Sequence, residues 1–215
     1  KGIIQELKVL LKTKSIGTNS DRALLLDFQA TLETKPEKAI KLEKDALAQI
    51  ENITADNARL VSNLHANLGG LYRINGHPDL AREHMEKSIS LLDQFNLLHI
   101  NDSIPQIANY AMFLTEQQEP ERGISELQKL SGIIKEYHSD HCLDYAKVQE
   151  TLGTIYLMTA NLPQAKTHFK RAFKIYEKIW ADEPEMIEAK YQEIQELYPQ
   201  IGFCIGKNLS GLLTK

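Results

Sequence analysis

The densest group of side chains that could do chemistry is His138-x-x-His141-Cys142, with Asp140 and Asp144 beside it. Imidazole and thiolate are zinc ligands, but a zinc site needs four well-placed ligands, and no second cluster follows in the sequence. The segment also falls between two expected helices, where polar residues are common. We therefore expect no metal and no cofactor.

Other catalytic patterns are absent from the sequence. It contains no Gly-x-Ser-x-Gly, no glycine-rich phosphate loop and no His-Glu-x-x-His. The abundant Asp and Glu residues are typical of solvated helix faces. We therefore expect a protein that is not an enzyme.

Composition narrows the function classes further. The 215 residues are 42% hydrophobic and 25% charged, with a net charge of −4, whereas nucleic-acid-binding domains usually present a basic face. No apolar run reaches the roughly 18 residues that cross a bilayer. Two cysteines far apart, Cys142 and Cys204, favour a reducing compartment. We expect a cytoplasmic protein that binds neither nucleic acid nor membrane, and the initial Lys1 suggests a piece of a longer chain.

The sequence repeats with a period of 42 residues, and this repeat determines where its helices lie. Prolines recur at this interval, and each is followed three residues later by a small residue: Pro36 and Ala39, Pro78 and Ala81, Pro120 and Gly123. Self-similarity at a fixed period indicates a repeat architecture. The complete repeats are 20–61, 62–103, 104–145 and 146–187. Residues 1–19 match only the second helix of a repeat, which the apolar stripe over residues 3–11 predicts. Residues 188–215 match a half repeat followed by a closing element at 201–213.

Each repeat predicts two helices, called A and B. In the second repeat, apolar residues at helical spacing predict helix A over Ala58–Ile74, and Asn75-Gly76 ends it. Pro78 begins helix B, which runs to about Gln94, because proline is tolerated in a first helical turn. Later repeats predict helix B from Pro120 and around Pro163, and a fifth helix A over Met186–Leu197 that stops at Tyr198-Pro199.

Three positions of the repeat predict how its helices pack. Counted from the first residue of each repeat, position 8 is mostly small, position 20 is always small, and position 34 is always large and apolar. Small residues allow two helix backbones to approach closely, and we expect the large residues to fill the space where the pair diverges. His84 and His168 share one position, which indicates a structural role. The residues are Asp27, Gly69, Ala111 and Gly153 at position 8, Ala39, Ala81, Gly123 and Ala165 at position 20, and Ile53, Phe95, Tyr137 and Ile179 at position 34.

These residues resemble the tetratricopeptide repeat. The pattern Leu-Gly-x-x-Tyr followed by a small and then a large apolar residue is carried by Leu68, Gly69, Tyr72, Ala81 and Met85, and again by Leu152, Gly153, Tyr156, Ala165 and Phe169. Asp27 replaces the family's glycine in the first repeat. The period exceeds the usual length of about 34 residues and is similar to that of kinesin light chains and many bacterial regulators.

The resemblance implies an all-α, right-handed superhelix. It would hold about four and a half helical hairpins and a C-terminal capping helix, as one solenoid domain over residues 1–215. The segments Ala108–Leu114 and Tyr198–Gly202 are also similar to C-terminal arrays of bacterial signalling NTPases, which implies an alternative function as the peptide-sensing arm of such an NTPase or of a transcription regulator.

In such arrays the A helices line a concave groove, so the resemblance implies a scaffold for a protein or peptide ligand within a larger bacterial regulator. Asn67 and Asn109 share one position, and each amide could pair with the backbone of an extended peptide. The alternative is that they lie on a solvated face or tie adjacent helices together. Self-association through the terminal helices is a further expectation. The expected groove residues are Asn63, Asn67, Arg73, Asn109, Met112, Glu116, Lys147, Thr151, Thr154 and Met158.

Overall fold

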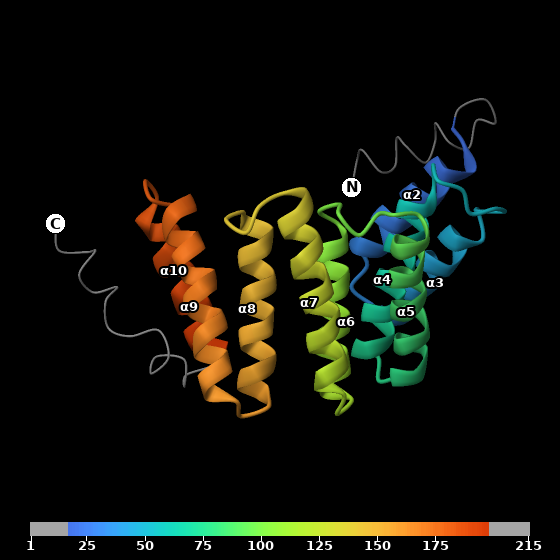
Figure 1. Cartoon of the computed structure of the whole chain (residues 1–215). Coiled ribbons are helices and arrows are strands. Elements are labelled where there is room, and N and C mark those ends of the chain that lie inside the picture. Colours follow the sequence, from blue (N-terminus) through green and yellow to red (C-terminus); the bar gives the residue numbers. More distant parts are fainter. Residues whose placement is uncertain (1–16, 198–215) are drawn as a thin grey trace. The chain divides into compact units, whose positions relative to one another are not determined.

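The computed structural model describes residues 17–197, and every regular element within that range is an α-helix (Figure 1). The chain forms two compact units, Lys1–Tyr110 and Ala111–Lys215, which meet within helix α6. The helices are α2 (Asn19–Thr31), α3 (Pro36–Leu47), α4 (Ala58–Ile74), α5 (Pro78–Gln94), α6 (Ser103–Glu116), α7 (Pro120–Tyr137), α8 (Leu143–Met158), α9 (Leu162–Ile179) and α10 (Pro184–Leu197).

The 42-residue period sets the start of every described helix B. Pro36, Pro78 and Pro120 each begin a helix, and Pro163 is the second residue of α9. In the first unit α2 packs on α3 and α4 on α5, and in the second unit α8 packs on α9. The predicted bounds of both helices of the second repeat are confirmed.

The turn between helices A and B has one geometry in three repeats. The residues at one repeat position, Gly76, Gln118 and Ala160, all have a positive φ, of 75°, 65° and 58°. The following N–H donates back to a carbonyl five residues earlier: His77 to Tyr72 at 2.9 Å, Glu119 to Leu114 at 2.8 Å, and Asn161 to Tyr156 at 2.7 Å. This is the Schellman ending of a helix, which favours glycine. The predicted stop at Asn75-Gly76 is confirmed.

Helices A and B approach so closely that position 8 has almost no room for a side chain. A Cβ atom added to Gly69 would lie 2.5 Å from Cγ of Met85, and one added to Gly153 would lie 2.9 Å from the Phe169 ring. Position 20 is equally restricted, since a Cβ on Gly123 would lie 2.6 Å from the carbonyl oxygen of Ala111. The prediction that small residues bring the helices together is confirmed.

The prediction for position 34 is wrong for three of its four residues, and the fourth, Phe95, is only half-buried. Ile53, Tyr137 and Ile179 are 40%, 53% and 41% exposed, so they do not fill an interior space. The reason is their place at or beyond the C-terminal end of helix B, past its contact with helix A. The interior is made instead by residues such as Leu64, Leu68, Leu127, Leu152 and Phe169, each at most 1% exposed.

The shared position of His84 and His168 has the same structural role in two repeats. Each imidazole stacks on the tyrosine of its own helix A, with ring centroids 5.4 Å apart for Tyr72 and His84 and 5.3 Å apart for Tyr156 and His168. Each Nδ1 also hydrogen-bonds to a residue on helix A: His84 to His65 at 2.8 Å, and His168 to Gln149 at 2.9 Å. The interpretation of these histidines as structural is confirmed.

Three predicted features lie outside the described residues: the helix over residues 3–11, the closing element at 201–213 and the helix stop at Tyr198-Pro199. The predicted fifth helix A is described as α10, which begins two residues earlier than expected. None of the helices within residues 17–197 combines the length and apolar character that a membrane crossing requires.

The shared turn predicts opposite effects for substitutions at one repeat position. A residue other than glycine at positive φ costs about 1 kcal/mol. Ala160→Gly should therefore raise the free energy of unfolding by about that amount, and Gly76→Ala should lower it by a similar amount. No atom lies within 4 Å of a Cβ at Gly76, so only the backbone is tested. Urea denaturation measures both variants, and a shift of both in the same direction would contradict the interpretation.

The His65–His84 contact predicts a loss of stability in acid. Burial and the neighbouring His84 lower the pKa of His65 from 6.5 to about 4, and burial lowers the pKa of His84. Between pH 6.5 and pH 4 the unfolded chain therefore binds more protons than the folded chain, so stability falls as the pH falls.

His65→Gln copies the Gln149–His168 contact of the other repeat and removes one of these groups. Its free energy of unfolding should decline less from pH 6.5 to pH 4 than that of the original chain, by on the order of 1–2 kcal/mol. Chemical denaturation across this pH range measures the difference. Parallel pH profiles for the two proteins would contradict the assignment.

Candidate functional site

Polar side chains of helices α2, α4 and α6 line an open cavity in the first unit. Its volume is about 320 Å³. Three of the predicted groove residues are among its walls, Asn63, Asn67 and Asn109, and all three come from the A helices as expected. The cavity is lined by Asp27, Asn63, Ala66, Asn67, Asp102, Pro105, Gln106 and Asn109.

One side of this cavity is held by an ion pair. Nε of Arg59 donates to Oδ2 of Asp102 at 2.6 Å, and this contact lowers the pKa of the Asp102 carboxyl. Asn63 bridges α4 and α6, because its Nδ2 donates to Asp102 at 3.4 Å and its Oδ1 accepts from Nε2 of Gln106. Both charges of the ion pair are already satisfied, so this side is polar but close to neutral.

The opposite side holds a pair of carboxyl groups. Nδ2 of Asn67 donates to Asp27 at 2.8 Å and to Glu43 at 3.2 Å, and so ties α4 to both helices of the preceding repeat. Glu43 is 1% exposed, and its Oε2 atom has no hydrogen-bond partner among the described residues. Burial, and then the nearby Asp27 carboxylate, raise the pKa of Glu43 to about 8. Glu43 is therefore protonated at neutral pH and can donate its proton to Asp27.

The two asparagines at the shared repeat position differ in their surroundings. Asn67 ties helices together through Nδ2, as one of the two alternatives had it, while its Oδ1 has no partner among residues 17–197. Asn109 is exposed, and its amide makes no hydrogen bond with the described part of the chain. An acceptor on Asn67 and both functions of the Asn109 amide therefore remain for a ligand.

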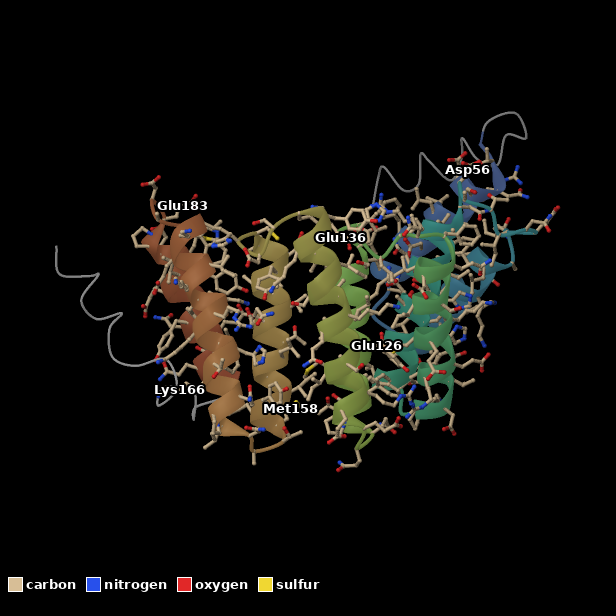
Figure 2. All side chains as sticks on the ribbon, in the orientation of Figure 1. Asp56, Glu126, Glu136, Met158, Lys166 and Glu183 are labelled. Carbon is tan, nitrogen blue, oxygen red and sulfur yellow. The ribbon has the colours of Figure 1, made fainter. Side chains whose placement is uncertain are left out.

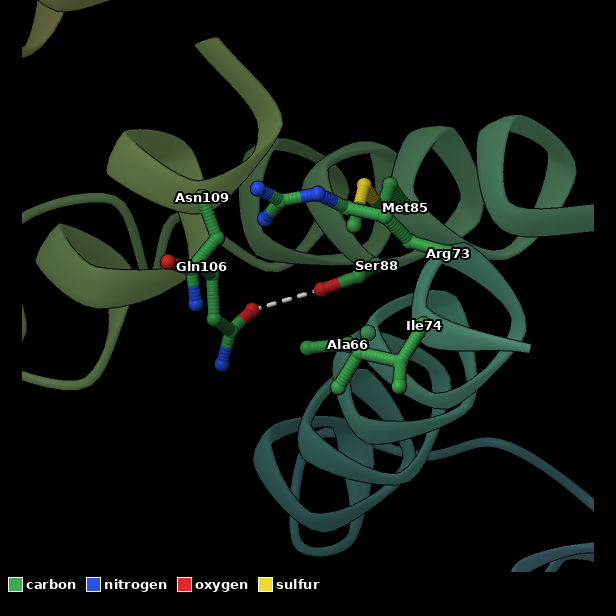
Figure 3. A pocket seen from close by; sticks show the side chains of 8 residues that line it. Ala66, Arg73, Ile74, Met85, Ser88, Gln106 and Asn109 are labelled. Carbon is green, nitrogen blue, oxygen red and sulfur yellow. Dashed lines mark hydrogen bonds between the residues drawn. The ribbon is translucent and has the colours of Figure 1, made fainter. Parts of the chain in front are cut away.

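A second, smaller cavity adjoins the first. It has a volume of about 180 Å³ and shares Ala66, Gln106 and Asn109 with the larger one, so the two form one groove. Its lining is more apolar, with Gly70, Ile74 and Met85, and it also includes Arg73. Figure 3 shows Arg73, Ile74 and Met85 around this cavity. Ile74 is 77% exposed. We call the joined cavities the α4–α6 groove.

A buried hydrogen-bond network fixes Gln106, which lines both cavities. Oε1 of Gln106 accepts from the hydroxyls of Ser62 at 2.8 Å and Ser88 at 2.6 Å (Figure 3). Both serines are fully buried. Because Gln106 is held from α4 and α5 together, the groove is largely formed before any ligand arrives.

The remaining predicted groove residues belong to the second unit. Met112 and Glu116 follow Tyr110 on α6, and the other four lie on α8. Lys147 is exposed, and its Nζ lies 3.5 Å from Oδ1 of Asp144. The hydroxyl of Thr151 donates to the carbonyl of Lys147 in the same helix. Thr154 is half-buried. Met158 is 44% exposed at the C-terminal end of α8 (Figure 2). The described cavities do not bring these residues together with Asn67.

Cys142 of the histidine-cysteine segment has a structural function. It is the N-cap of α8: its sulfur accepts from the N–H of Tyr145 at 3.4 Å, and its thiol lies 3.1 Å from the carbonyl oxygen of Ser139. His141 pairs with Asp140 beside it. Within the described residues no three His, Cys, Asp or Glu side chains are grouped as a metal would require.

Sequence reasoning missed the acidic part of the groove. The repeat pattern marks Asp27 only as a departure from the family's glycine, and it predicts no binding function for Glu43. The signal was present: position 24, which packs against position 8, holds Met85, Leu127 and Phe169 in the later repeats, but Glu43 in the first. Two departures at two contacting positions of one repeat identify a pair.

Comparisons with known proteins agree with this geometry. The sequence model of the tetratricopeptide repeat matches residues 103–178. No curated protein matches the chain in sequence. Solved structures match over most of its length. BtubC (BKLC) from P. vanneervenii is 19% identical, with a TM-score of 0.70 over 93% of this chain and 80% of that one.

Two similar structures come from Podosopora anserina. Both are of a putative kinesin light chain with nearly identical TPR-like repeats. Each is 15% identical to this chain. One, a single-substitution variant, has a TM-score of 0.67 over 84% of this chain and 90% of that one, and the other has 0.64 over 83% and 89%. With the 42-residue period and the paired helices, these matches show that the chain has the helical-hairpin fold of tetratricopeptide-repeat proteins, and the sequence model of that repeat matches residues 103–178.

Proposed function

We propose that the first unit binds an extended peptide segment of a partner protein along the α4–α6 groove. The observation that carries the proposal is the groove itself, a polar cavity joined to a more apolar one between the A helices of successive repeats. Tetratricopeptide-repeat proteins are generally non-enzymatic scaffolds for protein–protein interaction, which supports a binding function.

The chemistry of the groove suits an extended backbone. Every residue of such a peptide presents an N–H and a C=O that need partners once water is displaced. Oδ1 of Asn67 can accept from a peptide N–H, and the Asn109 amide can both donate and accept. The smaller cavity, with Gly70, Ile74 and Met85, takes a small apolar side chain. Backbone contacts supply affinity, and the apolar cavity supplies selectivity.

A role in a larger regulatory protein, including the sensor-arm alternative, rests on the resemblance alone. The groove is compatible with either role, because a sensor of a peptide signal and a scaffold for a partner both begin with capture of a peptide. The proposal is therefore limited to that capture.

Gly70→Met should block the groove without harming the fold. No atom lies within 4 Å of a Cβ at Gly70, and the new side chain would occupy the smaller cavity. Replacing a glycine within a helix also adds about 0.5–1 kcal/mol of helix propensity. A displayed library of random peptides is screened for binding to the original chain. The affinity of the selected peptides for the variant is then measured by fluorescence anisotropy. We expect a loss of about tenfold or more.

Gly132→Met is the matched control. Gly132 also lies within a helix, α7, and also has no atom within 4 Å of an added Cβ, but it lines neither cavity of the α4–α6 groove. Its affinity for the same peptides should equal that of the original chain. Equal binding by both variants, or no selectable peptide at all, would overturn the proposal.

A further inference from the structure

The carboxyl pair of the first repeat occupies a contact that is otherwise apolar. In the later repeats positions 8 and 24 hold Gly69 against Met85, Ala111 and Leu127, and Gly153 against Phe169. In the first repeat the same two positions are Asp27 and Glu43, whose side chains interact. The fold therefore does not require carboxyl groups here, since the second and fourth repeats make the contact without them.

This substitution is unfavourable for the free chain. Burying a carboxyl group costs free energy unless its oxygens are hydrogen-bonded or it is paired with a cation. Glu43 is 1% exposed, and no donor among the described residues reaches its Oε2, so its only compensation besides Asn67 is the proton that it shares with Asp27. Within residues 17–197 no lysine or arginine forms an ion pair with Asp27 or Glu43, and the donor they share is the neutral amide of Asn67. The pair lacks a counter-charge.

The pair also lies at the groove. Asp27 and Asn67 are walls of the larger cavity, and Glu43 lies directly behind them, bonded to Asn67. The other carboxylate of the cavity, Asp102, already has Arg59 as its partner. The negative charge that remains uncompensated in the groove is therefore concentrated at Asp27.

From this geometry we infer that the Asp27 end of the α4–α6 groove receives a basic side chain, lysine or arginine, of the partner peptide. The inference rests on the proposed peptide binding and adds its specificity. The ammonium or guanidinium group donates to Asp27 and to Oδ1 of Asn67, both of which accept. Glu43, behind Asp27 and Asn67, then loses its proton to solvent, so that both carboxyl groups are ionised while the cation is bound. The groove thus binds a cationic residue of the peptide at one end and a small apolar residue at the other.

The test uses two random peptide pools that differ at one fixed position, lysine in one and glutamine in the other. Binding of each pool to the full chain is measured by fluorescence anisotropy. The original chain should prefer the lysine pool by about tenfold or more. Asp27→Gly combined with Glu43→Met, which copies Gly69 and Met85, should abolish this preference, still bind the glutamine pool, and raise the melting temperature.

A second variant keeps the test decisive if the double variant folds poorly. Glu43→Gln retains the size of the side chain and its bond to Asn67 but cannot ionise when the cation binds, so it should reduce the preference for lysine. Asp45→Asn is the control: it removes an exposed carboxylate of α3 that lines neither cavity, and the preference should persist.

The outcomes separate this inference from the function beneath it. Equal binding of both pools to the original chain, or a lysine preference that survives in the double variant, overturns the basic-residue assignment and leaves peptide binding intact. Binding of neither pool overturns both. If millimolar Ca²⁺ or Mg²⁺ raises the melting temperature of the original chain but not of the double variant, the pair is a metal site and the basic-residue assignment falls.

Discussion

The structure depends on the close contact of helices A and B at positions 8 and 24. At Gly69 and Gly153 the partner helix is so near that an added Cβ would overlap Met85 or Phe169. This contact determines which residues of helices A and B face each other. The positive-φ turn ends helix A, so that helix B can fold back against it. Because both features recur every 42 residues, the first unit presents successive A helices side by side, and the α4–α6 groove lies between them.

The first repeat makes the same contact with different chemistry. Asp27 and Glu43 meet where the other repeats bury a small residue against an apolar one, and Glu43 keeps its proton because burial and Asp27 both oppose its ionisation. Such a pair is less favourable than the glycine and methionine of the next repeat. Because Asp27 lines the larger cavity, we propose that the pair serves to receive a basic residue of the partner peptide. Perturbed carboxyl groups in a cleft are candidates for binding on these grounds.

Much of the fold could be predicted, because short sequence signals determine where its helices begin and end. Pro78 and Gly76 fix the ends of α4 and α5, and the small residues at position 20 are buried as expected. The exposure of position 34 could not be predicted from residue type, since Ile53 and Ile179 are apolar but lie beyond the helix contact.

The groove was only partly predictable. The repeat register predicts that Asn63, Asn67 and Asn109 share a face, and all three line the larger cavity. The register does not say what a side chain meets across three helices. The partner of Asn67 is Asp27, 40 residues earlier, and that of Asn63 is Gln106, 43 residues later. Such pairs depend on side-chain reach between helices. Only the departure of two contacting positions from the repeat pattern could have revealed Glu43.

The most direct test is the titration of the Glu43 carboxyl group, followed by ¹³C NMR in the free chain. The account requires a neutral Glu43 that shares its proton with Asp27, and so predicts a pKa of about 8. A midpoint near 4.5, the ordinary value for glutamate, would show that another group already compensates the Glu43 charge, which would contradict an uncompensated carboxyl pair.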